Sequence, residues 1–374
     1  MWDTQHAVLY SQSLCMNASE LKLSLPWNPN IWEASTAAEW HRLIQNTPPP
    51  PQYLAILKMY TNPSYSSPPS QLNALSRILI LHGLMSISWD LNRREQTSHS
   101  LAVTSSTIPW QTRLSNCYAS WKSDFDQYTF SVLGTLSSAS RDHTKFQRFA
   151  IAILAVYHTA QLILEVDIID LQIHAGARHI IGRPVTDSDR VRSQTKISQW
   201  FARDGGLRAG KAVYHAARLF RDGVRKLKNW NVDDMFHYPW CLYLATLMCW
   251  TFHGAASQIN GSYSISPQNT SFACPSSTSP SLSSTTLAAP KAPTYLHSET
   301  SEDEDNDWDT AAEMNALISA LTRLDPSKDS FRAEVWDVGA KCRTYGLLSC
   351  MVKQLNTIRW AVVREGMIVL RALT

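Results

Sequence analysis

The sequence predicts an all-α fold, a multi-helix globular domain with one long disordered insertion. Apolar residues recur at the three- and four-residue spacing of helix faces, and the alternating pattern of strands is missing. Hydrophobic residues make up 44% of the 374 and charged residues only 17%, which is enough apolar material for a sizeable core. One Ser-, Thr- and Pro-rich stretch carries no such pattern and is expected to stay outside that core.

The first helices are expected to be short. Pro26, Pro29 and the proline run 48–51 interrupt the early part of the chain. Proline starts or ends a helix more readily than it continues one. We therefore expect short helical pieces before residue 72.

The segment 72–95 is expected to be a buried helix. It is apolar on every side from Ile78 to Leu91, so a helix there must be surrounded by other helices. We expect it to be the spine of the domain.

Later helices follow from apolar stripes and from stop and start signals. Apolar residues from Trp110 to Tyr128 form one stripe, and those from Val213 to Leu227 form another. Gly205-Gly206 is expected to end one helix and to let the next begin. Thr310 with Glu313 has the spacing of a capping box, which predicts a helix start at that point.

We expect three segments along the chain. Residues 1–256 form the main part of the helical domain. Residues 257–309, which end in an acidic run, cannot bury enough apolar area to offset the entropy of ordering and form the disordered insertion. Residues 310–374 form carboxyl-terminal helices that pack back on the same domain.

Cysteine usage and hydropathy indicate a reducing compartment and no membrane. The seven cysteines are odd in number and scattered, which is typical of reduced thiols in the cytosol or nucleus. The start of the chain lacks the features of a signal peptide. The longest apolar stretch, Phe149 to Leu164, contains His158 and is too short to cross a bilayer. The net charge of +3 is a weak signal for any partner.

Short sequence motifs run in a fixed order along nearly the whole chain. They resemble the C-terminal part of the fungal-specific transcription factor regulatory domain, the helical "middle homology" region downstream of zinc-finger DNA-binding modules. The motifs are Asp3-Thr4-Gln5-His6 with Tyr10, Leu25-Pro26-Trp27, His82-Gly83-Leu84-Met85-Ser86, Trp89-Asp90-Leu91, Tyr157-His158-Thr159-Ala160-Gln161-Leu162, His174-Ala175-Gly176-Ala177-Arg178, Pro239-Trp240-Cys241-Leu242-Tyr243, and Arg359-Trp360 through Arg364-Glu365-Gly366-Met367.

The resemblance implies a regulatory protein of the nucleus and no enzyme. It implies a helical module that modulates an attached DNA-binding domain through intramolecular or partner contacts, and leaves a small effector open. DNA is then contacted indirectly, transcriptional co-regulators are partners, and a homodimer is left open. No cofactor is expected in this chain. Zinc is expected only in fingers outside it, since we expect the chain to open inside the domain.

The enzyme alternative is a magnesium-dependent helical enzyme of terpene-synthase type. Asp233-Asp234 through His237 is similar to the first aspartate-rich motif of such enzymes, and Asn306-Asp307 with Thr310 and Glu313 to the second. Both are near misses. His237 stands where a carboxylate is needed, and the second set starts in the acidic insertion, where ligands are not preorganised.

Two further patterns are interpreted as structural. The stretch from Gly205 to Lys211 has the spacing of a phosphate loop, but Ala212 replaces the hydroxyl residue and no strand precedes it. Asp167, Asp170 and His174 share one helix face and could hold a metal, but no partner set appears on a second helix. Hydrogen bonding between helices is the favoured role.

Two sets of residues are candidates for regulatory contacts. A basic stripe could touch phosphates or a partner, although a solvated face near internal carboxylates is the favoured interpretation. It consists of Arg218, Arg221, Arg225 and Lys228. Ser298 and Ser301 lie beside the acidic run and are candidates for phosphorylation, while a plain linker is the favoured role of that insertion.

Overall fold

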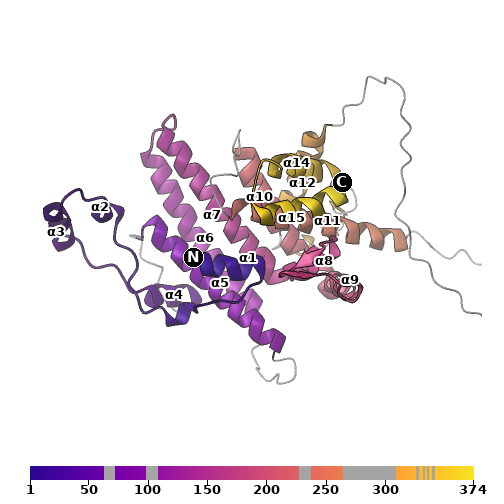
Figure 1. The fold of residues 1–374 in the computed structure, drawn as a ribbon. Helices are drawn as coiled ribbons and strands as arrows, with labels where there is room; N and C mark the ends of the chain where they lie inside the picture. Colours follow the sequence, from indigo (N-terminus) through magenta and orange to yellow (C-terminus); the bar gives the residue numbers. More distant parts are fainter. Residues whose placement is uncertain are drawn as a thin grey trace, which may run out of the picture.

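The computed structural model describes residues 1–62, 72–97, 108–226, 237–263, 309–325 and 342–374, with short pieces at 328–331, 333–334 and 337–338. The described chain is helical almost throughout, which confirms the predicted all-α class (Figure 1). The predicted insertion lies outside the described residues from position 264 to 308, and helix α11 continues to Tyr263, past the expected boundary at 257.

The helices before residue 175 are α1 (Trp2–Tyr10), α2 (Pro29–Trp32), α3 (Ala37–Gln45), α4 (Tyr53–Thr61), α5 (Ala74–Thr97), α6 (Trp110–Thr135), α7 (Arg141–Glu165) and α8 (Ile168–His174). The later helices are α9 (Asp187–Ala202), α10 (Leu207–Lys226), α11 (Tyr238–Tyr263), α12 (Thr310–Arg323), α14 (Tyr345–Leu355) and α15 (Ala361–Leu373). Two short 3-10 turns lie at Ala18–Glu20 and Arg203–Gly206.

Helix α7 is the central element of the fold. Ser140 caps its first turn by accepting from the His143 amide at 3.0 Å. The helix then runs through alanine and branched apolar residues that are buried on more than one side. Ile151 and Leu162 belong to a core cluster shared with α10, α11 and the carboxyl-terminal helices, whereas Val156 belongs to a cluster shared with α4, α5 and α6. Helix α7 therefore supplies side chains to both hydrophobic cores.

The helix expected to be the spine, α5, is buried as predicted but belongs to only one of these two cores. Leu81, Leu84 and Met85 are fully buried in the cluster shared with α4 and α6. Sequence periodicity could not rank α5 below α7, because both helices are apolar all round.

Helix α1 also contacts both cores. Val8 lies in the α5 and α6 cluster and Leu9 in the α10 and α11 cluster. In Figure 1, α1 is drawn in indigo across the middle of the molecule, between the long helices α5 to α7 and the carboxyl-terminal helices. Gln5 donates from α1 to the ring of His82 on α5 at 2.9 Å.

The proline-rich early segment forms short helices, as predicted. Pro29 is the first residue of α2, where its missing amide hydrogen is no loss. Helices α2 and α3 contact each other and project away from the rest of the molecule (Figure 1). No residue of α3 is buried.

A small hairpin is the feature that the sequence analysis missed. Strands β1 (His179–Ile180) and β2 (Arg183–Pro184) pair antiparallel around the two-residue turn Ile181-Gly182. Two-residue strands are too short to show an alternating pattern, so periodicity gave no signal for them. The hairpin joins α8 to α9.

The carboxyl-terminal helices pack on the preceding ones. Helix α12 contacts α10 and α14, and helices α14 and α15 contact α11. The predicted start of α12 is right, but the cap is shifted by one residue. Asp309, not Thr310, accepts the Ala312 amide at 2.9 Å, because Thr310 already lies in the first turn.

By length and composition, α7 is the described helix that could cross a membrane, and it is longer than the predicted apolar stretch because it begins at Arg141. Of its most apolar window, 72% is buried inside the protein. The core helix of a globular protein passes the same test of length and composition.

One buried ion pair holds α5 against α6. The Arg77 side chain is 2% exposed, and its Nε donates to Asp124 at 2.8 Å. Tyr60 of α4 donates its hydroxyl to the same carboxylate at 2.9 Å, and the Arg77 guanidinium lies 4.4 Å from the ring centre of Tyr128. A charge buried this deeply is tolerated because it is paired and hydrogen-bonded.

We predict that Arg77→Met lowers the free energy of unfolding by about 3–5 kcal/mol, because it leaves the Asp124 carboxylate buried without its partner. Denaturant titration followed by circular dichroism measures the change. Arg94→Met is the control, since Arg94 pairs with Asp90 on the surface at 72% exposure and should change stability by less than about 0.5 kcal/mol. Equal effects of the two variants would refute the assigned role.

Candidate functional site

A cavity of about 510 Å³ lies where five elements meet. Its walls come from α1, α8, the β1–β2 hairpin, α11 and α15, which are far apart in the sequence. The volume falls in the range of small-molecule pockets, roughly 300–1,000 Å³. We call it the aromatic cavity, because aromatic rings form much of its wall.

Stacked rings join α1 to α11 in this wall. The rings of Tyr10 and Trp240 lie nearly parallel with their centres 4.9 Å apart, and Trp240 lies 4.6 Å from Tyr243. The Trp240 indole donates to the carbonyl of Leu9 at 2.7 Å, which fixes α1 on α11. The Trp240 and Tyr243 side chains are almost wholly buried, so the stack is a rigid surface.

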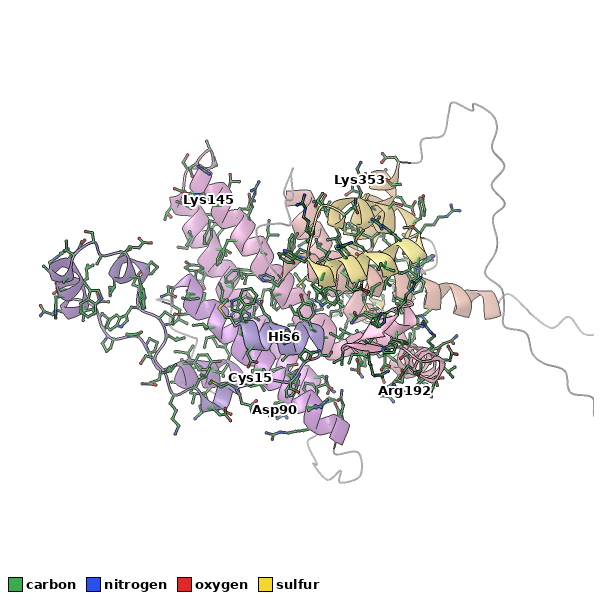
Figure 2. All side chains as sticks on the ribbon, viewed as in Figure 1. His6, Cys15, Asp90, Lys145, Arg192 and Lys353 are labelled. Atoms are coloured by element: carbon green, nitrogen blue, oxygen red, sulfur yellow. The ribbon has the colours of Figure 1, made fainter. Side chains whose placement is uncertain are left out.

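The cavity also has polar residues on its rim. Arg178 and His179 come from the hairpin side, Glu365 from α15 and His6 from α1. Figure 2 labels His6 on α1. Among the described residues, neither the Arg178 guanidinium nor the Glu365 carboxylate has a side-chain partner within hydrogen-bond or ion-pair distance. Two opposite charges are thus exposed and available beside an apolar wall.

Gly366 sets how closely α15 approaches the ring of Tyr243. A Cβ at this position would lie 3.1 Å from two ring carbons of Tyr243, tighter than an ordinary contact. Glycine therefore allows α15 to close this side of the cavity.

The tip of the hairpin has a strained residue at the cavity. Ile181 has φ 51° and Gly182 has φ 73°, as a two-residue hairpin turn with both central residues left-handed requires. A β-branched residue adopts this conformation at a cost of roughly 1–2 kcal/mol. The Ile181 side chain is nevertheless 54% exposed and lines the aromatic cavity as well as a neighbouring cavity of about 260 Å³ bounded by α1, α5 and α8.

The sequence alone does not predict this cavity, although the family-like motifs contain its residues. Four of the motifs that carry the family resemblance meet here: His6 with Tyr10, Ala177-Arg178, Trp240 with Tyr243, and Glu365-Gly366. Their spacing along the chain does not indicate that they are close in space, because up to 359 residues separate them, from His6 to Glu365. Only the packing of α1 and α15 on α11 does so.

The structure places the predicted basic stripe partly in internal contacts. Arg218 donates to the Tyr214 hydroxyl at 2.9 Å and lies over its ring, and Arg221 pairs with Asp222 at 3.0 Å. The backbone of Arg225 belongs to α10, while its side chain and all of Lys228 lie outside the described residues. Ser298 and Ser301 also lie outside them.

The three residues considered as possible metal ligands, Asp167, Asp170 and His174, make structural contacts. Hydrogen bonding between helices was the role favoured for them from the sequence. Asp167 caps α8 by accepting the Ile169 amide at 2.9 Å. Asp170 accepts from Ser193 at 2.7 Å and pairs with Lys196 at 2.8 Å, which ties α8 to α9. His174 lies against the ring of Trp250. Within the described ranges, no three metal-ligating side chains gather at one point.

The described residues do not form a site for the other two alternatives, the phosphate loop and the terpene-synthase motifs. The glycine pair at 205–206 follows α9 and a 3-10 turn, where a phosphate loop would follow a strand. In the motif similar to terpene synthases, the residues Asp233, Asp234, Asn306 and Asp307 lie outside the described part. His237 is buried, and its ring donates to the Ala152 carbonyl at 3.1 Å.

Three buried histidines and the half-buried His215 form polar contacts inside the helical body. His82 donates from Nδ1 to the Ile78 carbonyl at 2.7 Å and so accepts from Gln5 at Nε2. His158 of α7 and His215 of α10 lie Nδ1 to Nδ1 at 3.1 Å, so one ring donates while the other accepts. Burial lowers the pKa of His82 and of His215 to about 3, and lowers the pKa of His158 and His237 as well.

We predict that the free energy of unfolding falls as the pH drops from 7 toward 4. A histidine whose folded pKa lies below its unfolded value of about 6.5 binds protons mainly in the unfolded chain over that window. Each such group contributes a slope of up to about 1.4 kcal/mol per pH unit. The positive charges of Lys122, Arg218 and Arg221 near His158 act in the same direction.

Denaturant titrations at several pH values measure the slope. His215→Asn should reduce it, whereas His41→Asn on the exposed helix α3 should leave it unchanged. A slope that is the same for all three proteins would contradict the account.

Comparison with known proteins finds a family match at the start of the chain. Residues 1–123 match the family described as the fungal specific transcription factor domain. This match confirms the resemblance drawn from the motifs over the first third of the chain. The matched range covers α1 to α5 and the first half of α6.

Two relatives extend beyond this range. The chain is 37% identical over 371 residues to a nicotinate catabolism cluster-specific transcription factor of Emericella nidulans, covering 99% of this chain and 36% of the relative. It is 25% identical over 260 residues to zinc finger protein klf1 of Schizosaccharomyces pombe, covering 67% of this chain and 30% of the relative. The chain thus spans about a third of the length of these relatives. No solved structure matches it.

Proposed function

We propose that the chain is the regulatory region of a fungal transcription factor and acts in the regulation of DNA-templated transcription. The observation that carries the proposal is the likeness to the Emericella nidulans transcription factor along 99% of this chain. It includes the elements that form the aromatic cavity, and not only the matched domain at residues 1–123.

The architecture supports a module that responds rather than reads DNA itself. Helix α1, from the matched domain, is held on α11 by the Trp240 to Leu9 hydrogen bond and stacks its Tyr10 ring there. A ligand or partner that binds one arrangement of these helices better than another would shift the population of the two. The DNA-binding step then belongs to zinc fingers outside this chain, in the nucleus, with co-regulators as the protein partners.

The name of one relative suggests the kind of genes under control. The Emericella nidulans protein is named for a nicotinate catabolism cluster. We propose by similarity that this chain regulates genes for the catabolism of a small aromatic compound. The candidate phosphorylation residues Ser298 and Ser301, and partner contact through Arg218, Arg221, Arg225 and Lys228, remain proposals within this function.

We predict that the full chain, fused to a heterologous DNA-binding domain in a fungal cell, changes the output of a reporter gene severalfold relative to that domain alone. The sign of the change reports activation or repression. Arg77→Met should reduce the effect because it destabilises the helical body, and Arg94→Met should retain it. Output equal to that of the DNA-binding domain alone, from a fusion that accumulates normally, would contradict the proposal.

A second set of fusions tests the insertion. Deleting residues 264–304 leaves α11 and α12 intact, and replacing Ser298 and Ser301 by alanine leaves the length unchanged. Unchanged output from both would assign the segment a linker role. Loss in both would support phosphorylation of the two serines, and loss in the deletion alone would assign a role to another part of the segment.

A further inference from the structure

We infer that the aromatic cavity binds a planar aromatic carboxylate that carries a hydrogen-bond donor on its ring. This inference deepens the proposed regulatory function and rests on it for the consequence of binding. The binding step itself depends only on the residues of the cavity.

The wall determines the shape of the ligand. The Tyr10 ring stacks on Trp240 with centres 4.9 Å apart, and the Tyr243 ring lies tilted against Trp240 with centres 4.6 Å apart. The indole hydrogen bond to Leu9 holds Trp240 in place. A rigid aromatic surface of this kind favours a flat ring, which can stack on it or meet it edge to face. A cavity of about 510 Å³ has room for one or two fused rings with substituents.

The rim determines the charges of the ligand. Arg178 presents a planar guanidinium, which matches a carboxylate with two parallel hydrogen bonds. When ionised, the Glu365 carboxylate on α15 accepts hydrogen bonds but cannot donate them, so it recognises an N–H or O–H group. Since neither side chain has a partner among the described residues, both can serve the ligand without breaking an existing pair.

The hairpin supplies an independent observation. Ile181 is a β-branched residue with φ 51°, where asparagine or glycine would be easier, and its exposed side chain lines the cavity. Strain of this kind persists where the surrounding structure or function maintains it. The residue therefore places an apolar side chain at the cavity mouth at the expense of fold stability.

Isothermal titration calorimetry on the full chain tests the inference. The probe is 4-hydroxybenzoate. Its comparisons are 4-hydroxybenzamide without the charge, trans-4-hydroxycyclohexanecarboxylate without the flat ring, and benzoate without the donor. We expect saturable binding of 4-hydroxybenzoate and binding of the first two comparisons weaker by about tenfold or more. Benzoate should bind more weakly than 4-hydroxybenzoate, and Glu365→Leu, which removes the acceptor oxygens, should abolish that preference.

Three variants locate the binding. Arg178→Met should weaken binding of 4-hydroxybenzoate about ten- to a hundredfold and leave the amide unaffected, as expected for loss of a charge-assisted contact. Val362→Trp fills the cavity from α15 and should abolish binding. Arg364→Met is the matched control, since Arg364 is exposed on the same helix but does not line the cavity, and should change nothing.

Ile181→Asn separates a role in binding from a role in folding. It should raise the melting temperature, because asparagine tolerates the left-handed conformation, and yet weaken binding severalfold. A variant that folds better and binds worse cannot be explained by misfolding.

Three results would overturn the inference: no binding of any probe, equal binding of the acid and the amide, or full binding by both Arg178→Met and Val362→Trp. The outcome is separable from that of the proposed function. Intact binding with no effect of the fused chain on the reporter refutes the regulatory proposal alone. A reporter effect without binding refutes the ligand alone.

Discussion

The fold depends on one helix that must be covered on both faces. Helix α7 contributes Ile151 and Leu162 to one core and Val156 to the other, so neither core is complete without it. Burying each large apolar side chain on it contributes about 1.5–3 kcal/mol, and no face of the helix is left to water over its central turns. The remaining helices are arranged as the two layers that this requirement imposes, with α5 and α6 on one side and α10 and α11 on the other (Figure 1).

Helix α1, like α7, contributes side chains to both cores. It is short, yet it reaches both cores through Val8 and Leu9, and it ends on α11 through the Trp240 indole. The aromatic cavity forms at this end, where α1, α11 and α15 meet the hairpin. A ligand in the cavity would contact elements that pack, directly or through α11, against α7. A change in their packing would therefore alter the packing of both layers.

The sequence predicted those parts of the fold that are encoded locally. Apolar patterning located α5, α6 and α10, prolines and glycines located the breaks, and the Thr310–Glu313 capping pattern located the start of α12, with the cap off by one residue. It could not rank α7 above α5, since both are apolar all round, and it could not find two-residue strands. The cavity was beyond local reasoning, because Tyr10, Arg178, Trp240 and Glu365 meet only after long-range packing. The motifs that supply these residues were nonetheless visible in the sequence, but their convergence on one cavity was not.

Hydrogen exchange of the full chain, read by mass spectrometry, tests the shared helix most directly. If α7 joins both cores, its amides should be the slowest to exchange, and peptides from α5 and α11 should open with the same free energy as α7, in one cooperative step. The account would be contradicted if the α5 and α6 layer opened separately at a lower free energy while α7 and α11 stayed protected, because each core would then be stable without the other.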